Sequence, residues 1–208
     1  MACATQTPMM HIVTSSTPDL SLPTWQRKPL LLSLAVVVLA AVVLHLAGRI
    51  WWCESGDLAL WISSHSSSHT SQHLFDPYTF SHLLHGLIFY GLLHLVAPRL
   101  HVSWRLFVAV LIETGWELLE NSPVIIERYR KATASLGYTG DSIANSVMDI
   151  LACVVGFVVA RYIGWKGSVV IVVLTELIML ALIRDNLTLN IVMLIYPIQA
   201  IKSWQIGA

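Results

Sequence analysis

The chain has 208 residues, of which 56% are hydrophobic and only 12% are charged, whereas a soluble globular domain carries roughly 25% charged residues. This composition excludes an ordinary soluble domain. The 12 basic and 12 acidic residues cancel to a net charge of zero, so the chain has no electrostatic footprint for nucleic acid. The 3 cysteines are scattered without a Cys-x-x-Cys pair, so neither a disulfide framework nor a thiolate zinc site is predicted.

The N-terminal residues 1–29 are rich in Ser, Thr and Pro and lack a long apolar stretch, which predicts a flexible cytoplasmic tail. Residues 29–48 then contain no Asp, Glu, Lys or Arg, and at about 1.5 Å per residue they cover the roughly 30 Å hydrocarbon core of a bilayer. A signal peptide would have a shorter apolar region followed by a soluble domain, but further apolar stretches follow here. We therefore predict a single transmembrane helical domain over 30–208.

Further apolar stretches recur along the rest of the chain, several of them with ionisable residues inside. The last one is short and contains Pro197, so it either crosses at a thin point or lies at the surface. The predicted fold is an all-α, polytopic transmembrane helix bundle with five to six spans. The spans are expected at 29–48, 80–97, 106–119, 141–160, 167–183 and 187–201.

Basic residues near the ends of these stretches predict the orientation, because Lys and Arg are enriched in cytoplasmic loops. Alternate loops carry more of them than the loops between, which places the N-terminus in the cytoplasm and the long segments 50–79 and 121–140 outside. The predicted location is the bacterial inner membrane, with the lipid bilayer as the first partner. The basic residues assigned to the cytoplasmic side are Arg27, Lys28, Arg99, Arg105, Arg161, Lys166 and Lys202.

Ionisable side chains inside a bilayer cost roughly 2.5–3.5 kcal/mol each, so each needs a partner or a function. Here they fall into three groups whose spacing places each group along one side of a helix. In the predicted orientation all three groups occupy the outer half of the membrane, so they could meet. The groups are His82 and His85; Glu113, Glu117, Glu120 and Asn121; and Asp141, Asn145 and Asp149.

Imidazoles and carboxylates at one depth predict an outward-facing polar site, for which a divalent ion such as zinc, manganese or iron is a candidate cofactor. Spare carboxylates would transfer protons, and nearby arginines would hold an anionic group of a lipid or cell-envelope substrate. The expected metal ligands are His82, His85, Glu117 and Asp141; the expected catalytic groups are Glu113, Glu120 and Asp149; and the expected substrate-binding groups are Asn121, Arg128, Arg130 and Asn145.

Other interpretations of the same residues remain open. Polar stripes also hold membrane helices together, and carboxylates with histidines also form proton-coupled pockets, so a proton- or cation-coupled transporter and a structural subunit of a membrane complex are the alternatives. His65, His69 and His73 could capture a metal if helical, but the surrounding serines favour a loop. Gly86, Gly91 and Gly156 are expected to allow close helix packing.

Four strings carry a resemblance to a known family: SQHLFDPYTFSHLLHGLIFY, ETGWELLENSPVIIERYRKAT, GYTGDSIANSVMDILA and IRDNLTLNIVMLIYP. From about Trp51 to the C-terminus the chain resembles an uncharacterised family of bacterial multi-pass inner-membrane proteins. The resemblance implies a cell-membrane location and supplies no reaction or cofactor. A looser similarity is to the VanZ-like membrane proteins, on the residues Asp141, Asn145 and Gly156.

Overall fold

The computed structural model describes residues 24–63, 67 and 69–207. These residues form seven α-helices and no strand, apart from an isolated bridge between Trp61 and Phe75. The expected tail lies outside the described residues up to position 23. The helices are α1 (Arg27–Leu46), α2 (Thr79–Val96), α3 (Val102–Glu120), α4 (Pro123–Ala132), α5 (Ile143–Ile183), α6 (Leu187–Ile195) and α7 (Gln199–Ile206).

Three helices are long and apolar enough to cross a membrane, namely α1, α2 and α5, with mean hydropathies of 2.6, 1.3 and 2.2. This number is lower than the five to six spans expected from the sequence, for two physical reasons. Helix α3 has 19 residues but carries Arg105 and three glutamates, so its composition does not qualify. Helix α5 has 41 residues and combines two expected spans in one element.

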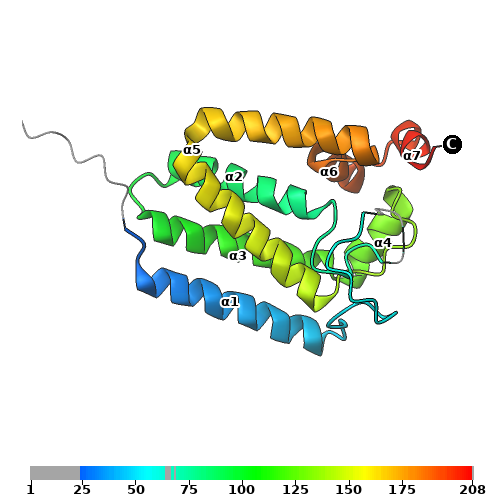
Figure 1. Ribbon diagram of the computed structural model, residues 1–208, viewed down its shortest axis with the longest axis horizontal. Helices are drawn as coiled ribbons and strands as arrows, with labels where there is room; N and C mark the ends of the chain where they lie inside the picture. The colour runs from blue at the N-terminus through cyan, green and yellow to red at the C-terminus, as the bar shows by residue number, and fades with distance from the viewer. Residues whose placement is uncertain (1–23, 64–66, 68, 208) are drawn as a thin grey trace, which may run out of the picture.

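The two arms of α5 meet at Gly164, whose φ of 70° and ψ of −178° are not helical. This backbone region is almost confined to glycine, because a side chain there would clash with the backbone. Figure 1 shows the consequence: α5 runs away from α4, reverses, and returns toward α6 and α7. The bundle therefore contains five long helical segments, which are α1, α2, α3 and the two arms of α5.

The stretch expected as a sixth span forms no spanning helix. Helix α6 has 9 residues, which at about 1.5 Å each cover less than half of the bilayer core. Pro197 separates it from the 8-residue α7. Lys202 of α7 donates a hydrogen bond to the backbone carbonyl of Lys131 at the end of α4, 2.5 Å away. This contact places Lys202 on the side of α4, opposite to the side expected from the sequence.

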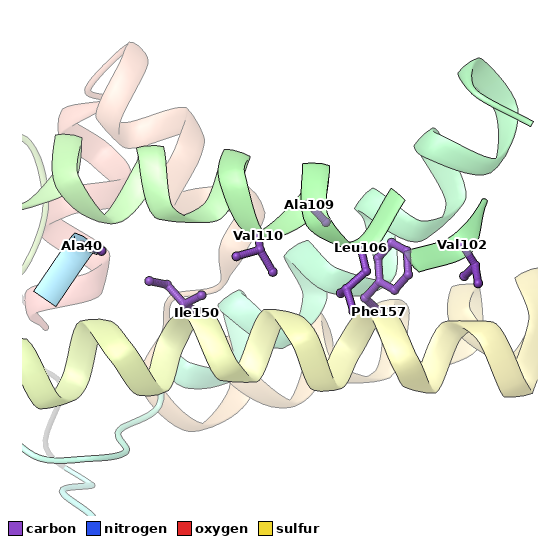
Figure 2. Close-up of a cluster of buried hydrophobic side chains, with 7 residues drawn as sticks. All are labelled: Ala40, Val102, Leu106, Ala109, Val110, Ile150 and Phe157. Carbon is purple, nitrogen blue, oxygen red and sulfur yellow. The ribbon is translucent and has the colours of Figure 1, made fainter. Parts of the chain in front are cut away.

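A cluster of buried apolar side chains joins α1, α3 and the first arm of α5 (Figure 2). Helix α1 contributes little to it, because only Pro29, Ser33, Ala40 and Leu44 of this helix are buried. The remaining leucines and valines of α1 are largely exposed, which is compatible with lipid surroundings and unfavourable in water. The members of the cluster are Ala40, Val102, Leu106, Ala109, Val110, Ile150 and Phe157.

Helix α2 crosses the first arm of α5 with the two backbones in close approach. A Cβ on Gly86 would overlap the carbonyl oxygen of Cys153, and a Cβ on Gly156 would overlap that of Leu83. The expectation of close packing is therefore confirmed for Gly86 and Gly156. It is wrong for Gly91, because no atom lies within 4 Å of the position that its Cβ would occupy. Because His82 and His85 lie just before Gly86, the crossing brings them against the α5 segment that carries Asp149.

Candidate functional site

The imidazoles of α2 converge on one carboxylate of α3. Nδ1 of His82 lies 2.6 Å from Oε1 of Glu113, and Nδ1 of His85 lies 3.0 Å from both oxygens of the same side chain. The i, i+3 spacing of the two histidines places them on one face of α2, so both can reach Glu113. His82, His85 and Glu113 form the first group whose atoms are close enough to share an ion.

His82 also belongs to a second group, on the side of α5. Its Nδ1 lies 3.3 Å from Oε1 of Glu117, and its Nε2 lies 3.9 Å from Oδ2 of Asp149. One ligand atom from each of these three residues lies within 4.8 Å of the other two. The i, i+4 spacing of Glu113 and Glu117 therefore surrounds His82 with carboxylates from two helices.

These groups are almost completely removed from solvent. Glu113 and Glu117 are 0% exposed, and Asp149 is 3% exposed. Neither carboxylate oxygen of Glu117 accepts a hydrogen bond, and Oδ1 of Asp149 has no hydrogen-bond partner either. A buried acceptor without a donor costs about 1–3 kcal/mol, and more when it is charged. The donor set therefore fits a cation, which would satisfy these oxygens.

Asp141, an expected metal ligand, lies outside both groups. Its Oδ1 accepts from the Tyr138 hydroxyl at 2.8 Å, and its Oδ2 accepts from the Asn121 amide at 2.8 Å. Asn121 also accepts from the backbone N–H of Asp141 at 2.7 Å. The hydrogen bonds between Asn121 and Asp141 therefore connect the end of α3 to the start of α5. The geometry replaces Asp141 in the ligand set with Glu113 and Asp149, which were expected as catalytic groups.

The two arginines expected to bind an anion are occupied by backbone carbonyls. Nε and NH2 of Arg128 donate to the carbonyls of Leu194 and Ile195, at 2.8 and 3.0 Å, and Nε of Arg130 donates to Tyr138 at 2.5 Å. These contacts hold α4 against the end of α6 and against the following loop. These hydrogen bonds join α4 to α6 and to the loop at Tyr138, and binding of an anion by Arg128 and Arg130 stays a prediction.

Of the other expected site residues, Glu120 lines the cavity and Asn145 is buried in the protein interior. Glu120 lines the cavity and faces the Tyr129 phenol. Asn145 is 1% exposed, and neither its amide nitrogen nor its side-chain oxygen has a hydrogen-bond partner. Asn145 therefore lies in the interior beside α3 and is absent from the cavity lining.

A cavity of about 330 Å³ leads to the cluster. Its polar end includes His82, His85, Glu113 and Asp149, whereas its outer wall is apolar. Ile88, Ile112 and Ile191 of that wall are exposed, whereas Leu187 is buried, so the wall reaches the surface of the bundle on α2, α3 and α6. Its apolar lining residues are Ile88, Phe89, Ile112, Trp116, Leu187 and Ile191.

Sequence reasoning missed Tyr78 and Tyr138, which line the cavity, and Asp76, which lies two residues before Tyr78. Asp76 lies just before α2 and accepts from the backbone N–H of Ser71 at 2.8 Å and of Tyr78 at 2.7 Å. Burial raises the pKa of Asp76 above its ordinary value, and these backbone hydrogen bonds offset part of the rise. Its position before an apolar helix was a usable signal, because Asp is common at such starts. Tyr78 and Tyr138 had no comparable signal in the sequence.

The loop before α2 is tied down over the same end of the bundle. Arg49 donates to the backbone carbonyl of Asp141, from NH2 at 2.7 Å, and the Gln72 amide donates to that of Gly140 at 2.5 Å. The backbone N–H of Ser142 donates to the carbonyl of Ser71 at 2.8 Å. The described residues of 49–75 therefore form a cap over the start of α5.

Comparison with known proteins identifies the family. Residues 44–207 match the family described as "Protein of unknown function (DUF2585)". A UPF0314 protein of Rhizobium meliloti (strain 1021) is 49% identical over 178 residues, which cover 86% of this chain and 90% of the relative. The chain belongs to the UPF0314 family.

Other members of the UPF0314 family are similar over nearly their whole length. The relative from Paracoccus denitrificans (strain Pd 1222) is 52% identical and covers 82% of this chain and 88% of its own. The relative from Brucella anthropi is 46% identical and covers 93% of this chain and 99% of its own. No solved structure matches the chain. The resemblance to an uncharacterised bacterial family is therefore confirmed, while the looser similarity to VanZ-like proteins stays a prediction.

Proposed function

We propose that this UPF0314 family member is a multi-pass protein of the bacterial inner membrane that binds a divalent metal ion at its His/Glu/Asp cluster and acts on a lipid or lipid-linked cell-envelope substrate. One observation carries the proposal: two imidazoles and three carboxylates come together between α2, α3 and α5, and four of these five side chains line a cavity that also has an apolar wall. An apolar wall suits an acyl chain, and the polar end suits a head group.

The ligand types favour zinc, manganese or iron. These ions accept mixed sets of imidazole and carboxylate ligands, whereas calcium and magnesium prefer oxygen alone. A bound ion with an open position would polarise a phosphoryl or carbonyl oxygen or generate hydroxide. Glu120, which lines the cavity outside both groups, is then the available proton acceptor.

The proposed topology has five crossings, made by α1, α2, α3 and the two arms of α5, with the N-terminus in the cytoplasm. Arg27 and Lys28 precede α1, Arg99 lies between α2 and α3, and Arg161 and Lys166 flank the reversal at Gly164. These basic residues would all face the cytoplasm, as the positive-inside rule requires. The cap, α4, α6 and α7 would then lie on the outer side.

A transporter would require a polar path from the cluster to the other side of the bundle. Beyond Gly86 on α2, the interior is filled by Leu87, Tyr90, Phe157 and Ala160. The next polar contact on α2, a hydrogen bond between NH1 of Arg105 and Nδ1 of His94 at 2.9 Å, lies beyond this apolar layer. A site that is closed at its inner end supports binding from one side in preference to transport.

The test is metal retention by the full-length protein in detergent. We expect the wild type to retain manganese, iron or zinc at the cluster after gel filtration, and His82→Ala to lose that ion because His82 belongs to both groups. Glu127→Gln is the matched control, since Glu127 is exposed on α4 and pairs only with Lys131. If His82→Ala retained as much of every metal as the wild type, the proposed site would be wrong.

A further inference from the structure

The cap brings three further metal-ligating side chains together, outside the cluster between α2, α3 and α5. Sγ of Cys53 lies 3.2 Å from Nδ1 of His69, and the rings of His69 and His73 stack with centroids 5.7 Å apart. One ligand atom of each residue lies within 4.8 Å of the other two. We infer that Cys53, His69 and His73 form a zinc-binding site in the cap. His65, which shares their spacing in the sequence, lies outside the described residues.

The surroundings of His73 fit a metal ligand. Its Nδ1 lies 2.6 Å from the carbonyl oxygen of Ala59, which can only accept, so Nδ1 carries the proton. In a neutral imidazole Nε2 then holds a free lone pair. His73 is 1% exposed, and its Nε2 is buried without a hydrogen-bond partner. A histidine anchored to a backbone carbonyl through one nitrogen characteristically binds metal through the other.

The thiol completes a ligand set that zinc prefers. Cys53 is 7% exposed, and the Ser55 hydroxyl, 3.2 Å from its sulfur, can donate to a thiolate. One thiolate and two imidazoles leave a fourth tetrahedral position open. Cys53 and His69 border a second cavity, of about 470 Å³, from which water or a substrate group could fill that position.

Zinc at this site would fasten the cap over the membrane-facing cavity. The segment between His69 and His73 contains Thr70 and Ser71, which line that cavity. The same segment is joined to the start of α5 through Gln72 and Ser71. An ion bound to Cys53, His69 and His73 would therefore fix the position of these two lining residues.

Cobalt provides the test, because it replaces zinc and gives an intense near-ultraviolet charge-transfer band only when a thiolate binds it. We expect this band in the full-length wild type titrated with Co²⁺ in detergent, and its loss on adding Zn²⁺. Cys53→Ser should abolish the band, whereas Cys153→Ser, which changes the buried cysteine of α5, should retain it. His73→Ala should weaken the affinity by about 10-fold or more.

A second readout covers a Cys53 variant that fails to fold. Bound zinc should slow maleimide labelling of Cys53 in the wild type, measured on the Cys53 peptide by mass spectrometry. His82→Ala should leave both the band and this protection unchanged, which separates the cap site from the proposed membrane site. A wild type without the band, a band that survives Cys53→Ser, or labelling that zinc does not slow would each overturn the inference.

Discussion

Glu117 is the residue whose surroundings are hardest to explain by folding alone. It is 0% exposed, neither of its oxygens accepts a hydrogen bond, and Nδ1 of His82 lies 3.3 Å from its Oε1. A residue kept only to hold helices together would be expected to make the hydrogen bonds that Asn121 and Asp141 make. Glu117 therefore has the properties of a metal ligand that lowers the stability of the folded protein until the ion is bound.

Glu117→Met tests this interpretation. The substitution removes a buried polar group without partners and keeps a similar volume, so we expect the metal-free protein to gain about 1–3 kcal/mol of unfolding free energy. Its metal affinity should fall by about 10-fold or more. Thermal unfolding in detergent with and without metal measures both effects. A metal-free Glu117→Met protein that is less stable than the wild type would contradict the account.

Asp185, between α5 and α6, predicts a pH dependence of stability. Burial is the largest cause that raises the pKa of this carboxyl to about 6, and the Tyr78 hydroxyl donates to it at 3.1 Å. Because the folded state binds the proton more tightly than the unfolded state does, stability is greatest below about pH 4 and falls as the pH rises through 6, by about 3 kcal/mol. Asp185→Asn should remove this loss.

The measurement is the unfolding temperature of wild type and Asp185→Asn across pH 4 to 8. We expect the two curves to converge at the acidic end and to separate as the pH rises. Parallel curves would show that Asp185 does not bind a proton on folding.

At the level of elements, the crossing of α2 with the first arm of α5 positions the site. Gly86 and Gly156 let the two backbones touch, so His82 and Asp149 approach from facing helices. The stripes of His, Glu and Asp were predictable from helical spacing, as was their convergence. Their pairing was not, because Asp141 lies before the start of α5, where it bonds to Asn121 and Tyr138, whereas Asp149 lies within the helix beside His82.

Gly86→Ala should therefore separate the two helices. We expect overpacking to cost about 1–3 kcal/mol of stability and to weaken metal retention, because the added methyl group meets backbone atoms of Cys153 and Phe157 that cannot rotate away. Gly91→Ala on the same helix is the control, since nothing lies within 4 Å of its Cβ position. This control should be neutral or slightly stabilising. Equal effects of both substitutions would contradict the packing argument.

At the scale of the whole molecule, hydropathy predicted an all-helical chain and the positions of its long apolar segments. The consecutive spans expected at 141–160 and 167–183 imply a reversal between them, and the structure has it at Gly164. Hydropathy did not single out this glycine, because a glycine within an apolar stretch also fits a straight helix. It also suggested a sixth span at 187–201, where the structure has two short helices separated by Pro197. The cap was unpredictable, since Cys53 and His69 meet only after the loop has folded.

The proposed topology predicts which loops face outward. Alkaline phosphatase fused after residue 57 or 137 should be active, because this reporter folds only outside the cytoplasm, whereas fusions after 99 or 164 should be inactive. A fusion at the C-terminus should also be active, since five crossings end outside. An inactive C-terminal fusion would indicate an even number of crossings and contradict the surface position of α6 and α7.

The central claim is that a metal ion binds between α2, α3 and α5. X-ray absorption at the zinc edge of the Cys53→Ser protein tests it most directly, because this variant removes the thiolate of the cap site. We predict about one retained zinc per chain, with a first shell of nitrogen and oxygen that includes imidazole, and its loss on adding His82→Ala. A Cys53→Ser protein that retains no ion with any of zinc, manganese or iron, or a shell unchanged by His82→Ala, would contradict the account.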